Sequence, residues 1–191
     1  MTEQTAYLSS GSTVLRGFRE QDLEALAGWW DNPAVTELLE MGARPTRPKE
    51  LADFWQLCSA RDDCVVFAIC ERNSGNVIGT CGLYQISWIA RRAQFNILIG
   101  EPSVWDQGHG TRSTELSLSY AFDTLNLESV HLGVNAENVR AMRSYERAGF
   151  VKEGVRRRFV YRNGRYYDSV MYSILRNEFD AGRAANGEDK S

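Results

Sequence analysis

One glycine-rich turn constrains the fold of this chain more than any other feature. It lies in the segment VWDQGHGTRST, residues 104–114, where Gly108 and Gly110 flank His109. Apolar alternation before the turn predicts a strand at 95–99, and the pattern after it predicts a helix. A helix N-terminus exposes backbone N–H groups and favours negative charge, and glycine leaves room for an anion to approach the backbone. The turn therefore indicates a phosphate or pyrophosphate site, with a turn that binds nothing as the alternative.

A second motif follows in the segment VNAENVRAMRSYERAGF, residues 134–150. Asn138, Ala141 and Tyr145 recur at i, i+3 and i+7, so they share one face of a predicted helix. Gly149 ends that helix. The face presents a side-chain amide, a small methyl group and a phenol, a set that suits a ligand. A purely structural interpretation stays open here, with Ala141 and Tyr145 in the core and Asn138 capping the helix.

The composition is that of an ordinary soluble globular protein. The 191 residues are 43% hydrophobic and 25% charged, with a formal net charge of −3. We therefore expect one domain with a sizeable core and no DNA partner. Six basic and two acidic side chains fall within 152–168, so the rest of the chain is more acidic than the total. That imbalance mildly favours a cationic substrate.

The four cysteines, Cys58, Cys64, Cys70 and Cys81, form no C-x-x-C pair and have no histidine nearby to complete a metal site. We expect buried free thiols, as in a reducing compartment, and no bound metal. The first residues lack the basic and apolar regions of a signal peptide. No apolar run reaches the ~18 residues of a membrane span. These features predict a cytoplasmic protein without a membrane partner.

The order of elements predicts one mixed α/β domain. Apolar alternation and apolar runs indicate strands, whereas a period of three to four residues indicates helices. We expect strands at 13–18, 64–70, 77–86, 93–99, 130–134, 150–155, 160–162 and 166–175, and helices at 20–30, 35–41, 48–60, from the glycine-rich turn to 125, and at 137–148. The domain is expected at 13–176, between a flexible N-terminus at 1–12 and a flexible tail at 177–191.

Together the two motifs resemble those of the GCN5-related N-acetyltransferases, the GNAT superfamily. The phosphate-binding pattern of that family is Q/R-x-x-G-x-G/A, and residues 105–110 read WDQGHG here. Its later pattern, N-x-x-A-x-x-x-Y-x-x-x-G-F, is met from Asn138 to Phe150. The resemblance extends over the order of elements from 13 to 175.

Two further segments resemble one branch of that family, which contains ribosomal-protein N-terminal and spermidine acetyltransferases. They are Arg91-Arg92-Ala93, before the central strand, and the hairpin YRNGRYYDSVMYSIL at 161–175. In this branch a tryptophan such as Trp105 is familiar in place of the first Gln or Arg. The resemblance implies a mixed, mostly antiparallel central sheet that is splayed between its fourth and fifth strands and flanked by helices.

The resemblance also implies acetyl-CoA as the acetyl donor. The strand around Leu98 and Ile99 would offer backbone hydrogen bonds to the pantetheine arm. Asn138 would hydrogen-bond the same arm, and Arg147 could pair with a CoA phosphate. The pyrophosphate would lie in a cradle formed by Gln107, Gly108, His109, Gly110 and Thr111, with His109 contributing its backbone rather than its ring.

The implied reaction is direct attack of a primary amine on the thioester in a ternary complex. An alkylamine with a pKa near ~10 is mostly protonated at pH 7, and binding both reactants together supplies much of the rate. Tyr145 would donate a proton to the departing thiolate, a role worth about 10²–10⁴-fold. Neither motif contains a cysteine, which disfavours a covalent acetyl-cysteine.

The general base stays open. Several relatives carry Glu at the position of Gln94, and glutamine accepts no proton at useful pH. Glu101, Asp106 or a chain of waters could take that role. His131, alone on its strand, is expected to be a hydrogen-bonded histidine of the sheet, with a catalytic histidine as the alternative.

The acceptor is open as well. Acidic and aromatic groups at the early helices, which border the acceptor pocket in this family, would suit a polyamine, amino sugar or aminoglycoside. The candidates are Trp29, Trp30 and Glu37 in those helices and Glu101 after the central strand. Asp31 and Glu40 belong to the same early helices. Amphipathic helices with acids in solvent are the alternative reading of these residues. A protein N-terminus as acceptor, a non-catalytic CoA-binding regulatory module, and a homodimer or larger homo-oligomer also remain. The basic segment 156–165 could contact a CoA phosphate, an acidic peptide or ribosomal RNA, or could be a charged strand edge or a dimer contact.

Overall fold

Eight strands form one sheet in the computed structural model, which describes residues 6–40 and 42–188. The strands are β1 (Leu8–Ser10), β2 (Thr13–Gly17), β3 (Val65–Glu71), β4 (Val77–Ser87), β5 (Arg92–Ile99), β6 (Ser129–Asn135), β7 (Val151–Arg162) and β8 (Arg165–Leu175). Their order in the sheet is β1-β2-β3-β4-β5-β6-β8-β7. All neighbours are antiparallel except β5 and β6, which confirms the mixed, mostly antiparallel sheet.

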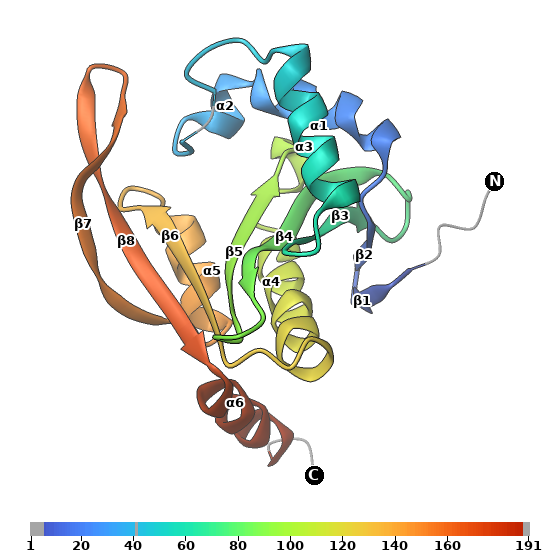
Figure 1. Ribbon diagram of the computed structural model, residues 1–191, viewed down its shortest axis with the longest axis vertical. Coiled ribbons are helices and arrows are strands. Elements are labelled where there is room, and N and C mark those ends of the chain that lie inside the picture. The colour runs from blue at the N-terminus through green and yellow to red at the C-terminus, as the bar shows by residue number, and fades with distance from the viewer. Residues whose placement is uncertain (1–5, 41, 189–191) are drawn as a thin grey trace.

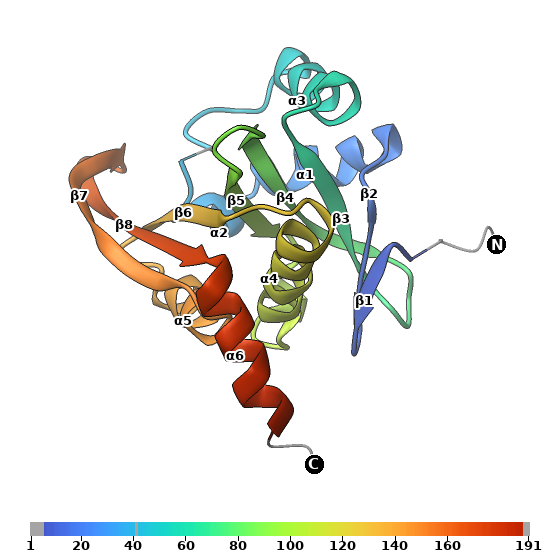
Figure 2. The same ribbon diagram turned by 60° about the horizontal axis from the view of Figure 1, so that its bottom comes forward.

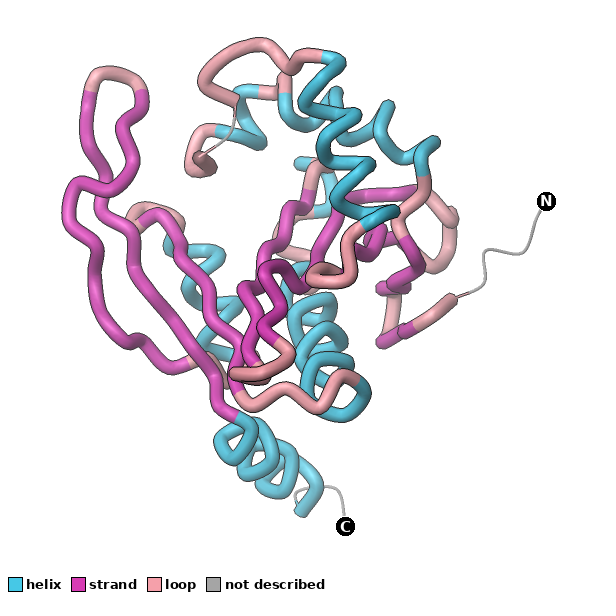
Figure 3. Tube along the Cα trace, in the orientation of Figure 1, coloured by secondary structure: helices cyan, strands magenta, loops and turns pink. Residues whose placement is uncertain are grey.

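The parallel pair β5–β6 is held by a short register. Arg92 pairs with Ser129, Ala93 with Val130 and Gln94 with His131, after which no further rows pair. Beyond that point the two strands separate, as Figures 1 and 3 show. The predicted splay is therefore confirmed. We predicted the splay between the fourth and fifth strands. These are β5 and β6 in the structure, because the prediction did not include β1.

Six helices accompany the sheet in the described part of the chain. They are α1 (Leu23–Trp30), α2 (Pro33–Thr36), α3 (Pro48–Ala60), α4 (His109–Ser119), α5 (Val139–Arg147) and α6 (Arg176–Glu188). Helix α2 is shorter and earlier than the helix expected at 35–41, because Pro33 starts it and Asn32 caps it by accepting from the Ala34 N–H at 3.0 Å. A π-helical turn, Tyr120–Thr124, prolongs α4 toward the predicted end at 125.

Helices cover both faces of the sheet (Figures 1 and 2). Helices α4 and α5 pack on one face, in a core that includes Phe95 of β5. Helices α1 and α3 pack on the other, in a core that includes Leu98. Because side chains alternate along a strand, Gln94 lies on the α1–α3 face and Phe95 on the α4–α5 face. The splay is thus bordered by different helices on its two sides.

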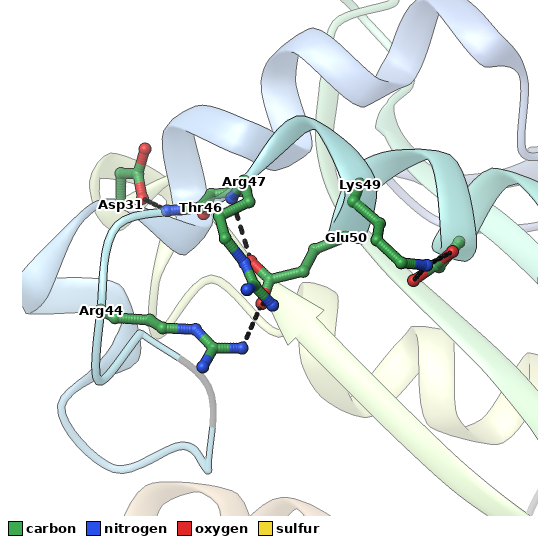
Figure 4. Close-up of polar contacts among 7 residues, drawn as sticks. Asp31, Arg44, Thr46, Arg47, Lys49 and Glu50 are labelled. Atoms are coloured by element: carbon green, nitrogen blue, oxygen red, sulfur yellow. Dashed lines mark hydrogen bonds and ion pairs between the residues drawn. The ribbon is translucent and has the colours of Figure 1, made fainter.

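The loop before α3 is fixed by two carboxylates (Figure 4). Asp31 accepts a hydrogen bond from the Thr46 N–H at 2.7 Å. Glu50 accepts from the Arg47 N–H at 3.0 Å and from the guanidiniums of Arg44 and Arg47. These donors lower the pKa of Glu50 to about 2, with the Arg47 N–H as the largest cause. Asp31 is therefore occupied in holding the chain that enters α3.

Both termini are more structured than predicted. We expected a flexible segment at 1–12, of which 1–5 lie outside the described residues, but β1 pairs with β2 from Leu8 to Ser10. We expected a flexible tail at 177–191, but α6 extends to Glu188, and 189–191 lie outside the described residues. Phe179 packs on Phe122 with ring centroids 4.8 Å apart, and Arg183 pairs with Asp123 at 2.8 Å. Both partners come from the turn after α4, a contact that periodicity alone does not reveal.

The cysteines are free, as predicted, and three of the four are buried: Cys64, Cys70 and Cys81. Across the described residues, no helix has the length and apolarity needed to cross a membrane.

Candidate active site

The glycine-rich turn opens directly into α4. Gly108 precedes the helix in the left-handed region, with φ of +81°. This backbone conformation favours glycine. A Cβ there would also come within 2.7 Å of the Arg112 guanidinium, which would have to shift. A Cβ at Gly110 would meet only Ser144 Oγ, at 3.8 Å. The first N–H groups of an α-helix have no intrahelical partner. This turn therefore presents such groups where no side chain of its own covers them.

Arg112 fixes the turn to the β1–β2 edge of the sheet. Its guanidinium donates to the Gln107 carbonyl at 2.6 Å, and to Ser12 Oγ and Thr13 Oγ1 at 2.9 and 3.0 Å. The Gln107 side chain donates to the Ser103 carbonyl at 2.9 Å and does not line the cleft. Sequence reasoning missed Arg112, because its partners lie about 100 residues earlier in the chain.

The His109 ring points into the core. It is 2% exposed, and its Nδ1 lies 2.9 Å from Thr13 Oγ1. Burial, and then the nearby Arg112 charge, lower the pKa of this imidazole. Only the His109 backbone is left to face a ligand, as the sequence suggested. Thr111 differs, because its side chain lines the cleft and lies 2.9 Å from Ser144 Oγ of α5.

A cleft of about 1250 Å³ runs from this turn through the splay to the early helices. It is bounded by the start of α4, by β5 and β6, by α5, by the β7–β8 hairpin and by α1 and α2. Among the predicted site residues, it is lined by Trp30, Leu98, Ile99, Gly108, His109, Gly110, Thr111, Asn138, Tyr145 and Arg147. A backbone cradle that a larger side chain would fill, at one end of a long cleft, fits an elongated donor with a phosphate group.

The register of β5 decides which backbone groups face the splay. The Gly100 N–H donates to the Ile78 carbonyl at 2.8 Å. Because hydrogen-bonded rows alternate in an antiparallel pair, Leu98 bonds to β4, whereas Ile97 and Ile99 face the splay. The Ile99 carbonyl already accepts from Trp105 Nε1 at 2.9 Å. We predicted that the Leu98 backbone would hydrogen-bond a ligand in the splay, and this is wrong because that backbone bonds to β4. Ile97, which the prediction did not name, has the backbone groups that face the splay.

Asn138, the N-cap of α5, and Tyr145 within it both line the cleft, and both also have the structural roles of the alternative interpretation, as a cap and a core residue. Asn138 caps the helix, since its Oδ1 accepts from the Ala141 N–H at 3.1 Å, which leaves its NH₂ group to donate elsewhere. Tyr145 is 8% exposed and packs edge-on to Phe95, with ring centroids 6.5 Å apart. Burial raises the pKa of its phenol. Within the described residues its hydroxyl has no hydrogen-bond partner, and the residue lines the cleft.

Three arginines of α5 also line the cleft: Arg140, Arg143 and Arg147. All three are exposed, and the Arg140 guanidinium lies 3.9 Å from the Trp105 ring centroid. Sequence reasoning named only Arg147. The i, i+3, i+7 spacing of the three is visible in the sequence and predicts a shared face, so this cationic face could have been found.

The residues predicted for the acceptor separate in the structure. Trp29 is 4% exposed, lies in the core under Gly100, and donates from Nε1 to Glu101 Oε1 at 2.9 Å. Neither Trp29 nor Glu101 lines the cleft, and Glu37 lies outside it as well. Trp30 does line it, and so does Glu40. The tryptophan that packs on the sheet and the one that faces the cleft are adjacent, and tertiary packing alone distinguishes them.

The β7–β8 hairpin extends toward the side of the molecule that carries α2 (Figure 1), and it lines the cleft there. Arg162 donates to the carbonyls of Leu39 and Gly42, each at 3.0 Å, and to Thr36 Oγ1 at 3.2 Å. Phe159 and Val160 of β7 line the same end. The expected hairpin therefore also connects the C-terminal half of the sheet to the early helices.

The acetyltransferase (GNAT) domain family matches residues 13–151, well over half of the chain. The chain belongs to the GNAT family. It is 35% identical over 111 residues to the spermidine N(1)-acetyltransferase of Vibrio cholerae, a match that covers 58% of this chain and 64% of the relative. It is 30% identical over 108 residues to the putative ribosomal N-acetyltransferase YdaF of Bacillus subtilis, covering 56% and 57%. Both kinds of enzyme in the predicted branch are thus among its relatives.

Solved structures give the same result. A spermidine N-acetyltransferase from Vibrio cholerae, in complex with CoA and spermine, superposes with a TM-score of 0.81 at 27% identity, covering 89% of this chain and 99% of that one. A dodecameric structure of the Vibrio enzyme has a TM-score of 0.75 at 28% identity, covering 89% and 97%. This GNAT protein is an acetyl-CoA-dependent N-acetyltransferase. Among the described residues, no cluster of three His, Cys, Asp or Glu side chains could hold a metal ion.

The Trp29–Glu101 contact yields a first prediction. Glu101→Gln keeps an oxygen for the Trp29 N–H, so we expect kcat and KM within twofold of wild type. Glu101→Leu removes the acceptor and leaves a buried donor unpaired, so the free energy of unfolding should fall by about 1–3 kcal/mol. Steady-state kinetics and urea unfolding measure the two effects. A large fall in kcat for Glu101→Gln would instead give its carboxylate a part in the reaction.

Proposed function

We propose that this GNAT enzyme transfers the acetyl group of acetyl-CoA to a primary amine of a small molecule, by direct attack in a ternary complex. The single observation that carries the proposal is the continuous cleft. It joins the N–H groups of the α4 turn to an aromatic and acidic pocket at the early helices, and passes the splay between them. Donor and acceptor bound at its two ends would meet at the splay.

The donor end suits the chemical groups of CoA. The N–H groups at Gly108, His109, Gly110 and Thr111 would receive the pyrophosphate. The cationic face of α5 would pair with further phosphate groups, as guanidinium does with phosphate. The backbone of Ile97, the Ile99 N–H and the Asn138 amide would bind the pantetheine arm.

Tyr145 is proposed as the general acid. The amine nitrogen attacks the thioester carbonyl carbon, an N–C bond forms, and the C–S bond breaks. The departing sulfur needs a proton, and the pKa of the Tyr145 phenol is raised by burial, so the phenol holds its proton at neutral pH. With no competing partner among the described residues, that proton is available to the sulfur.

The acceptor end supports a small cationic amine. Trp30, Phe54 and Tyr84 line it together with the carboxylate of Glu40. Aromatic faces and a carboxylate both attract an ammonium group. Hydrogen bonds from Arg162 tie the hairpin to Thr36, Leu39 and Gly42 across this end. Such a crossing suits a polyamine, amino sugar or aminoglycoside better than a protein N-terminus, which remains the second candidate because of the likeness to YdaF.

We also propose that the protein forms a homodimer or larger homo-oligomer and that it is cytoplasmic. The Vibrio spermidine N-acetyltransferase that this chain resembles forms a dodecamer. That likeness supports a homo-oligomer here.

The test is a free-thiol release assay with acetyl-CoA and a panel of amines. The panel contains spermidine, aminoglycosides, nucleotide-linked amino sugars and peptides with free N-termini. We expect turnover with a small amine and little with the peptides. Turnover restricted to peptides would replace the acceptor class, and acetyl-CoA binding without any turnover would favour the non-catalytic regulatory module.

Tyr145→Phe tests the proton donor. Removing the hydroxyl leaves the packing against Phe95 in place, so we expect kcat to fall at least tenfold while the Kd for acetyl-CoA changes less than twofold. Rapid-quench kinetics and calorimetry measure the two quantities. An unchanged kcat would remove Tyr145 from the mechanism.

Gly110→Trp tests the phosphate cradle. The site of its Cβ is open, so an indole there would fill the space above the α4 N-terminus. We expect acetyl-CoA binding to weaken at least 100-fold. Gly110→Ala is the matched control, because its Cβ makes only an ordinary contact with Ser144, and it should bind within a few-fold of wild type. Tight binding by a folded Gly110→Trp protein would contradict the pyrophosphate assignment.

A further inference from the structure

His131 does not have the environment that the sequence predicted. We expected a histidine that is hydrogen-bonded within the sheet. The ring is half-buried, lines the cleft, and forms no hydrogen bond with any described residue. Its ring nitrogens are also not among the fully buried polar atoms that lack a partner, so they are not sealed off from the cleft. An imidazole that faces a reaction cleft with free nitrogens has no structural role that its contacts explain.

The position of His131 in the sheet is specific. It pairs with Gln94 in the last row of the parallel register, directly where β5 and β6 separate. Paired residues on neighbouring strands share a face, so His131 and Gln94 lie on the α1–α3 side of the sheet. Tyr145 lies on the opposite side, where it contacts Phe95. The proposed acid and this imidazole thus border the splay from its two faces.

We propose that His131 is the general base of the acetyl transfer and takes a proton from the acceptor nitrogen. This inference rests on the proposed function. When the amine attacks, the N–C bond forms and the C–S bond breaks. One N–H proton passes to an imidazole nitrogen of His131, and the sulfur takes the proton of Tyr145. His131 then releases its extra proton to solvent, and Tyr145 takes one back. The net result is transfer of one proton from nitrogen to sulfur.

The other candidates for this role are placed less well. Gln94 shares the row but accepts no proton. Glu101 is outside the cleft and bonded to Trp29. Asp106 is exposed in the turn at the phosphate end of the cleft, and Glu40 lies at the opposite end beside α2.

The charged groups around His131 favour a neutral ring. Burial is the largest cause that lowers its pKa, followed by Arg92 on β5, and Arg156 on β7 acts in the same direction. Glu153 on β7 opposes them, but its carboxylate is bonded to Ser173 Oγ on β8 at 2.8 Å. With its pKa below the ordinary value near ~6.5, the imidazole is unprotonated at neutral pH. The rate should therefore rise with pH through that pKa and level off above it.

The test compares His131→Gln with wild type on the best amine of the panel, from pH 5 to 9. Glutamine keeps the size and polarity of the side chain but accepts no proton. We expect kcat to fall at least tenfold, with the Kd for acetyl-CoA within twofold, and the acidic limb of the pH profile to disappear. Ser129→Ala, two residues earlier on the same face of β6 and outside the cleft, is the matched control and should keep both rate and profile.

A double variant adds a readout that a structural role would not move. In the His131→Gln background, Gln94→Glu places a carboxylate on the paired residue, and recovery of kcat with a new acidic limb would support the proposal. Unchanged kcat and an unchanged limb in His131→Gln would overturn it while leaving the acetyltransferase function intact. Absence of turnover by wild type on every amine would instead refute the proposed function, and this inference with it.

Amines of different basicity provide a second measurement if His131→Gln fails to bind acetyl-CoA. An acidic limb at the same pH for every amine belongs to the protein and supports His131. A limb that follows the pKa of each amine, with no shared component, would overturn the proposal.

Discussion

The short parallel pairing of β5 and β6 is the constraint on which the rest of the site depends. Three rows join the strands, and the two then part. A continued ladder would satisfy the backbone groups of Ile97 and Ile99 within the sheet and close the cleft. Because the ladder stops, the backbone groups of Ile97 and the Ile99 N–H face open space, where an amide-containing ligand can complete the hydrogen bonding that buried backbone requires. The Ile99 carbonyl already accepts from Trp105 Nε1. The gap is stable because each strand keeps an antiparallel neighbour, β4 and β8.

Different parts of the chain occupy the two sides of this gap. On one side, α4 and α5 bring the phosphate turn, the cationic face and Tyr145. On the other, the early helices and the hairpin bring the aromatic pocket and Glu40. Contacts across the molecule hold these parts in place. Arg112 ties the turn to Ser12 and Thr13. Arg162 ties the hairpin to Thr36, Leu39 and Gly42. The arrangement separates the donor from the acceptor and leaves the splay as their common boundary.

Much of this could be predicted because the decisive signals are local. The glycine-rich turn before a helical pattern is visible in the residue types, and glycine readily adopts the positive φ found at Gly108. The spacing of Asn138 and Tyr145 fixes their shared helix face. The predictions that were wrong involve register and packing. Trp29 and Trp30 are adjacent on one helix, and only the surface that α1 meets makes one a core residue. Leu98 was predicted to face the splay in place of Ile97, an error of one residue in strand register. A shift of one residue turns the backbone N–H and C=O groups to the opposite edge of the strand.

By itself, the sequence determined the mixed α/β fold, the phosphate-binding turn, the phenol on α5 and the GNAT resemblance, because each is carried by residue types at fixed short spacings. Tertiary structure decided the rest. It placed the His109 ring in the core, removed Trp29 and Glu101 from the cleft, folded α6 onto the turn after α4, and set His131 beside Gln94 at the splay. Each of these depends on a partner far away in the chain, and composition and periodicity carry no information about such distant contacts.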